Sequence, residues 1–138
     1  MESHRRRRRR PSTFTALFPS AQAELHQVGW HDPTAGLADG STDMAFVWLP
    51  LPDNRRFRWV VMVSEPRCVA VPRQHRLAAS DTVTFADLID EPFLALPESA
   101  GQLREYWLAL DARGGRHPRI GAVIGSPDEA AHVSSVTL

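Results

Sequence analysis

The sequence contains no lysine, so all 16 of its basic residues are arginines, and it has a single cysteine, Cys68. One cysteine excludes an intramolecular disulfide and is typical of a reducing compartment. No apolar run approaches the roughly 20 residues that a membrane-spanning helix needs. The arginine-rich start is not followed by the apolar segment of an export signal. These absences predict a cytoplasmic protein without a membrane partner.

Catalytic signatures are also missing from the sequence. It contains no G-x-S-x-G elbow, no phosphate-binding P-loop, no H-E-x-x-H and no C-x-x-C motif. The only candidates for a metal cluster are His26, His31 and Asp32, and their spacing across a presumed strand and turn matches no usual ligand pattern. We therefore predict no catalytic residue, no metal, no cofactor and no enzymatic activity.

Basic charge is concentrated in one tract, Arg5 to Arg10. Without this tract, ten arginines face 16 acidic residues, so the rest of the chain is acidic. Nucleic-acid-binding domains normally spread basic residues over a folded face. We interpret residues 1–12 as a disordered leader, produced by a truncated or frame-shifted gene. Nonspecific nucleic-acid binding through the tract is the alternative.

Short apolar runs alternate with helix signals after the leader, which is typical of an α/β domain. Strands are predicted at residues 23–30, 43–50, 57–63, 68–72, 93–97 and 119–125. Helices are predicted at residues 32–40, 84–90, 99–115 and 126–133. Thr84 with Asp87 forms a weak relative of a capping box, and Ser99 with Gln102 forms a full one. Ser126 is the expected N-cap of the last helix.

Three blocks follow one another in a specific order and spacing. The first is a Leu-x-x-Gly-x-x-Asp pattern at Leu37, Gly40 and Asp43. The second is a Val-Pro-x-x-His-x-Leu-Ala pattern at Val71, Pro72, His75, Leu77 and Ala78. The third is a Phe-x-Asp-Leu-x-x-Glu-Pro-Phe pattern at Phe85, Asp87, Leu88, Glu91, Pro92 and Phe93. Together with residues 126–133, the blocks resemble the effector-binding domain of LysR-type transcriptional regulators over residues 13–133.

The resemblance implies a type 2 periplasmic-binding-protein-like fold, in which two α/β lobes hold a small effector between them. It places a partial first lobe at residues 13–65 and a partial second lobe at residues 66–138. The family's helix-turn-helix domain, first strand and closing segment are not found, so we interpret the chain as truncated at both ends and marginally stable. DNA would then be bound only through a domain absent from this chain, and dimerisation through lobe edges is possible.

The resemblance also implies a small organic anion or aromatic acid as the effector. The candidate effector-binding residues are Trp48, Pro97, Glu98, Ser99 and Ser126. Ser126 begins a helix, whose free N–H groups attract carboxylates, but the same serine can serve only as a cap. Pro97 to Ser99 follow a strand, where α/β folds bind ligands, or they form an ordinary loop. Trp48 either lines the cleft or packs in the core.

The residues of the three blocks are expected to have structural roles. Gly40 and Asp43 would mark a helix exit and a strand start, and His75 would make loop hydrogen bonds. Cys68 is expected to be a buried, inert thiol. A free-standing solute-binding protein of the same fold is a further alternative, although it would require an export signal and a complete second lobe.

Overall fold

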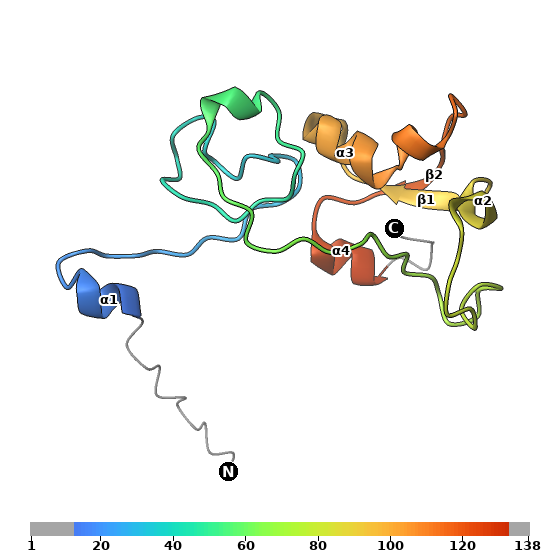
Figure 1. Ribbon diagram of the computed structural model, residues 1–138, viewed down its shortest axis with the longest axis horizontal. Coiled ribbons are helices and arrows are strands. Elements are labelled where there is room, and N and C mark those ends of the chain that lie inside the picture. Colours follow the sequence, from blue (N-terminus) through green and yellow to red (C-terminus); the bar gives the residue numbers. More distant parts are fainter. Residues whose placement is uncertain (1–12, 133–138) are drawn as a thin grey trace, which may run out of the picture.

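The computed structural model describes residues 13–132, and most of its regular structure lies in the second half of the chain (Figure 1). The arginine tract and residues 133–138 lie outside the described residues. The elements in order are the helix α1 (Thr13–Leu17), the 3-10 turn η1 (Asn54–Arg56), α2 (Phe85–Leu88), the strand β1 (Pro92–Ala95), η2 (Glu98–Ala100), α3 (Gln102–Trp107), η3 (Leu110–Ala112), β2 (Arg119–Val123) and α4 (Pro127–His132). The architecture is therefore mixed α/β, as predicted.

Strands β1 and β2 form a two-stranded parallel sheet. The register pairs Pro92 with Arg119 and Ala95 with Val123, with an irregularity after Phe93. Parallel neighbours need a long crossover, and here α3 lies in the connection between them. Both strands were predicted, and the structure confirms them.

The side chains of β1 alternate between two hydrophobic clusters, as the pleat of a strand requires. Phe93, which is fully buried, and Ala95 pack with Leu88 and Leu108 on one face. Leu96, just after β1, packs with Ala100, Leu103 and partly buried tryptophans in the second cluster. The core thus lies on both faces of a small sheet.

The first half of the chain does not form the predicted strands. Residues 23–30, 43–50, 57–63 and 68–72 are irregular apart from an isolated bridge at Ala70. Met44 is 84% exposed and Val60 is 81% exposed. An apolar, β-branched run favours a strand only when a neighbouring strand accepts its backbone hydrogen bonds and a second layer covers its side chains. Neither condition is met for residues 43–50 and 57–63, so these strand predictions were wrong.

Turns replace the helix predicted at residues 32–40. The Asp32 carboxylate accepts hydrogen bonds from the backbone N–H of Thr34 at 2.9 Å and of Gly36 at 2.7 Å. This side chain therefore organises a tight turn in competition with a helix. Gly40 has a φ of 78°, which suits a turn, but no strand begins at Asp43. The expected helix exit and strand start were wrong here.

The helix predicted at residues 99–115 is divided into η2, α3 and η3. Gly101, with a φ of 52°, is the N-cap of α3, so the capping box expected at Ser99 and Gln102 was wrong. The second break is at Ala109, which also has a φ of 52°. By contrast, Thr84 does cap α2 in a full capping box, in which its backbone N–H donates to the Asp87 carboxylate at 2.9 Å; its hydroxyl donates to the same oxygen at 2.7 Å.

A buried arginine fixes the chain between α2 and η3. The Arg113 guanidinium donates to the carbonyl oxygens of Leu108 at 2.8 Å and Ile89 at 3.1 Å, and lies 4.5 Å from the centre of the Phe93 ring. Burial lowers the pKa of Arg113 from its ordinary value, because desolvation disfavours its charge. The aromatic face and the two carbonyl groups offset part of that cost.

The second and third sequence blocks meet at Glu91. Its carboxylate accepts hydrogen bonds from Arg76 at 2.7 Å and lies 3.4 Å from Nε2 of His75. Arg76 also donates to the carbonyl oxygen of Asp87. The loop that carries His75 is thereby attached to the start of β1 by a contact between two residues for which structural roles are predicted.

The Glu91 carboxylate should make stability depend on acid pH. The hydrogen bond from Arg76, followed by that from His75, lowers the pKa of Glu91 below its ordinary value of 4.5. A carboxyl group with a lowered folded pKa stabilises the fold above its unfolded pKa and loses this contribution as pH falls through the folded pKa. We expect Glu91→Gln to lower the free energy of unfolding by about 1 kcal/mol at pH 7.

Urea unfolding of both proteins between pH 7 and pH 3 would measure this difference. It should shrink toward zero only as pH falls through the lowered pKa of Glu91 in the folded chain, because both proteins then carry an uncharged side chain at position 91. Glu105→Gln, on the exposed side of α3, is the matched control and should change little. A difference that stays constant across the pH range would contradict the assignment.

Candidate functional site

The carboxyl ends of β1 and β2 lie side by side, because the strands are parallel and their last residues are paired. The backbone pairing continues beyond the strands, with the N–H of Ile124 donating to the carbonyl oxygen of Ala95 at 2.9 Å. Pro97 follows β1 and Ser126 follows β2. The structure thus places two of the predicted site segments at one edge of the sheet, where parallel α/β folds bind ligands.

A third segment, not predicted from the sequence, closes this edge. The N–H of Trp30 donates to the carbonyl oxygen of Gly125 at 2.8 Å, and the indole packs against Leu96, Ala100 and Leu103. Gly29 makes the close approach possible, since a Cβ there would lie 3.0 Å from the same Gly125 oxygen. Trp30 was assigned to a strand, and the adjacent glycine was the only signal for this contact.

The Asp32 turn follows Trp30 directly, and the N–H of Asp32 donates to the carbonyl oxygen of Gly29 at 3.4 Å. Burial alone would raise the pKa of Asp32, but hydrogen bonds from Thr34 and Gly36 outweigh it, and the pKa is lowered. The carboxylate is therefore ionised at neutral pH and satisfied within its own turn, with Thr34 Oγ1 at 2.7 Å. At the edge, the Asp32 carboxylate fixes the backbone conformation of the turn, and its negative charge is stabilised by the hydrogen bonds from Thr34 and Gly36.

The exposed groups at the edge are Glu98 and Ser99, with Pro97 and Ser126 half-buried. Ser126 Oγ accepts from the N–H of Glu129 at 3.3 Å, so the serine does cap α4. Glu129 in turn accepts from the N–H of Gly125 at 2.6 Å. As an acceptor in its cap bond, the Ser126 hydroxyl still keeps its own proton to donate.

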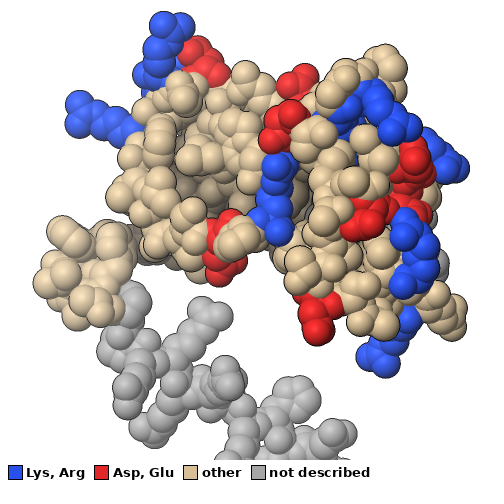
Figure 2. All heavy atoms as spheres, turned by 45° about the vertical axis from the view of Figure 1, so that its right-hand side comes forward, with Lys and Arg blue, Asp and Glu red and all other residues tan. Residues whose placement is uncertain are grey.

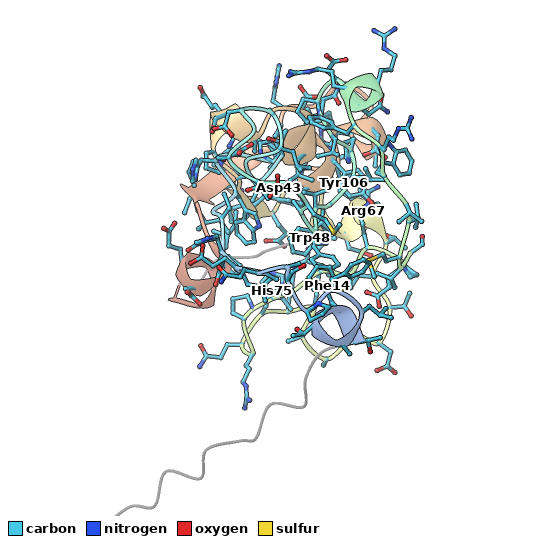
Figure 3. The ribbon with its side chains drawn as sticks, turned by 90° about the vertical axis from the view of Figure 1, so that its left-hand side faces the viewer. Phe14, Asp43, Trp48, Arg67, His75 and Tyr106 are labelled. Atoms are coloured by element: carbon cyan, nitrogen blue, oxygen red, sulfur yellow. The ribbon has the colours of Figure 1, made fainter. Side chains whose placement is uncertain are left out.

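Trp48 lies on a different segment, residues 41–50, and is 58% exposed (Figure 3). Neither hydrophobic cluster of the described residues includes it. The structure therefore brings Pro97, Glu98, Ser99 and Ser126 to one edge but records no contact that joins Trp48 to them. The packing role considered for Trp48 is not observed.

Cys68 is exposed, so the buried thiol expected at this position was wrong. Its segment is irregular and forms no strand that a second layer could cover. Between residues 13 and 132, no group of three or more histidine, cysteine or acidic side chains is arranged to hold a metal ion. No helix within this same range is long and apolar enough to cross a membrane.

Comparison with known proteins gives one family. The model of the LysR substrate binding domain matches residues 9–134. The chain belongs to this family. HTH-type transcriptional regulator ShiR of Corynebacterium glutamicum is 34% identical over 112 residues, which are 80% of this chain and 38% of that protein. HTH-type transcriptional regulator AlsR of Bacillus subtilis is 29% identical over 63% of this chain and 28% of its own length.

A further relative is the uncharacterized HTH-type transcriptional regulator YnfL of Escherichia coli, 29% identical over 65% of this chain and 30% of its own length. No solved structure is significantly similar to the chain. The chain thus spans between 28% and 38% of the length of these three regulators. Family membership confirms the resemblance read from the three sequence blocks.

The contact between Gly29 and Gly125 can be tested with a matched pair of methyl additions. Gly29→Ala would force its Cβ against the Gly125 oxygen and the His31 ring, which lies 2.9 Å away. Gly125→Ala would meet only the Glu129 carboxylate, at 3.6 Å. We expect Gly29→Ala to lower the free energy of unfolding by about 1–3 kcal/mol, as overpacking does.

Gly125→Ala should stay within about 0.5 kcal/mol of the unmodified chain. Urea unfolding followed by tryptophan fluorescence measures both values, and the summed emission of the four tryptophans should shift to the red in Gly29→Ala as Trp30 becomes exposed. Equal stability of the two variants would show that residues 29–31 do not dock on the sheet.

Proposed function

We propose that this chain is the effector-sensing module of a LysR-type regulator and binds a small organic anion or aromatic acid at the carboxyl edge of β1 and β2. The observation that carries the proposal is the adjacency of Pro97–Ser99 and Ser126 at that edge in a member of a substrate-binding family. Pro127 has no N–H and the N–H of Glu129 is bonded to Ser126 Oγ, so the edge offers the N–H of Asp128 and the Ser126 hydroxyl proton. A carboxylate accepts hydrogen bonds from both kinds of donor.

The two-lobed division at about residue 65 belongs to the same proposal. In that arrangement residues 13–65 supply the opposite wall of the cleft, and Trp48 would face the effector from it. The effector favours the closed arrangement of the lobes in proportion to its differential affinity for the two states. In the whole regulator, which acts in the cytoplasm, the closure would reach DNA through a domain outside these 138 residues, and lobe edges would serve dimerisation.

Charge supports a sensing role over a nucleic-acid role for the described residues. Arginine and acidic side chains are interspersed on the face seen in Figure 2. Three arginines form ion pairs: Arg67 with Asp111, Arg76 with Glu91 and Arg116 with Asp90. A surface that contacts phosphates would keep such groups unpaired and grouped.

Replacing Ser126 by Asp tests the site without removing the helix cap. Aspartate is as good an N-cap as serine, so α4 should remain stable, but its charge repels an anion at the edge. We expect benzoate binding, measured by saturation-transfer NMR, to weaken at least about tenfold in Ser126→Asp. Benzyl alcohol, which has the same ring and no charge, should be affected much less.

Ser64→Asp is the matched control, because it makes the same exchange at an exposed position outside the edge. It should bind benzoate as the unmodified chain does. Equal benzoate affinity in Ser126→Asp and Ser64→Asp, or no binding of benzoate and related aromatic carboxylates by the unmodified chain, would refute the proposed site.

A further inference from the structure

A cavity of about 500 Å³ lies apart from the sheet edge, between residues 67–83 and the core that α2 and η3 cover. We call it the Cys68 pocket, because the exposed Cys68 is part of its lining. Its volume is within the range of small-molecule sites. None of Trp48, Pro97, Glu98, Ser99 and Ser126 lines it.

Apolar side chains form the walls of the pocket. They are Val69, Val71, Leu77, Val83, Phe85 and Leu88. Five of them, all except Val71, also pack on the cluster around Phe93 or belong to it, so the walls are held by the core beneath them. An apolar lining with a small number of polar groups is typical of sites that take the apolar body of a small molecule.

The one cation in the lining is already neutralised. Arg67 pairs with Asp111 at 3.2 Å, donates to the carbonyl oxygen of Tyr106 at 2.9 Å, and its guanidinium lies 4.5 Å from the centre of the Tyr106 ring (Figure 3). The hydrogen bond from Arg67 lowers the pKa of Asp111, so the Asp111 carboxylate and the Arg67 guanidinium are both charged at neutral pH. Arg67 is therefore not free to bind an anionic ligand.

The anion in the lining is unpaired. Asp81 is exposed and forms no hydrogen bond or ion pair with any other residue between 13 and 132. It is flanked by Ser80 and Thr82, which also line the pocket and whose hydroxyl groups make no such bond within that range. The polar side of the pocket thus offers a free carboxylate and two hydroxyl groups, and these accept hydrogen bonds from a cation.

We propose that the Cys68 pocket is a second ligand site, which takes a small apolar molecule bearing one amine. The apolar body contacts the valine, leucine and phenylalanine walls, and the ammonium group lies at Asp81. This preference is opposite to that of the sheet edge, where an anion is proposed. The inference stands independently of the proposed function, because the two sites share no lining residue.

Tryptamine is a suitable probe, with indole-3-acetate as the probe of opposite charge and nearly the same shape. Cys68 is the only thiol of the chain, so its rate of reaction with a disulfide reagent such as DTNB reports occupancy of the pocket. We expect tryptamine at millimolar concentration to slow this reaction saturably. Indole-3-acetate should protect Cys68 about fivefold less well, as expected for one partly exposed charge pair.

Three variants of the full chain decide between specific and incidental protection. Asp81→Asn should remove the preference for tryptamine over indole-3-acetate. Ala112→Phe and, separately, Ala78→Phe should fill the pocket and abolish protection, with Ala23→Phe as the matched exposed control. Ser126→Asp should leave the protection unchanged, which keeps this test separate from that of the sheet edge.

No slowing by tryptamine would overturn the proposal. Protection that persists in both filled variants would overturn it too, because the probe would then bind elsewhere. Equal protection by the two probes in the unmodified chain would refute the amine preference.

Discussion

The parallel pairing of β1 with β2 is the constraint on which the rest of the structure depends. It separates the two hydrophobic clusters, because Phe93 and Ala95 point to one face of the sheet and Leu96 packs on the other side. It also aligns the two strand ends, so that the carbonyl oxygen of Gly125 is free to accept from Trp30. The pairing of β1 with β2 therefore positions both the hydrophobic core and the candidate site.

The sequence blocks that indicate the family are explained largely by the contacts that anchor this pair. His75 and Arg76 of the second block meet Glu91 of the third, and Asp87 completes the cap of α2. These interactions fix where the chain enters β1. A strand of four residues has little length with which to define its own position, so side-chain contacts at its start are needed to set it.

Sequence reasoning succeeded where the local signal and the tertiary environment agree. The strand at residues 93–97 and the caps at Thr84 and Ser126 are local features, and the structure confirms them. It failed at residues 57–63, whose apolar pattern requires partners elsewhere in the chain. Trp30 was missed because its contact with Gly125 joins residues far apart in sequence, and no periodicity reveals such a contact.

Stability is unevenly distributed as a result. Within the described chain, residues 58–68 make no backbone–backbone hydrogen bond, and the side chains of Trp59 to Val63 are more than half exposed. A run exposed on both faces buries little apolar area, and burial is the main favourable contribution to folding. Segments with few buried contacts open at low free-energy cost, whereas strands in a core open only with the whole domain. Residues 85–132 therefore form the stable part, and the sheet edge and the Cys68 pocket both rest on it.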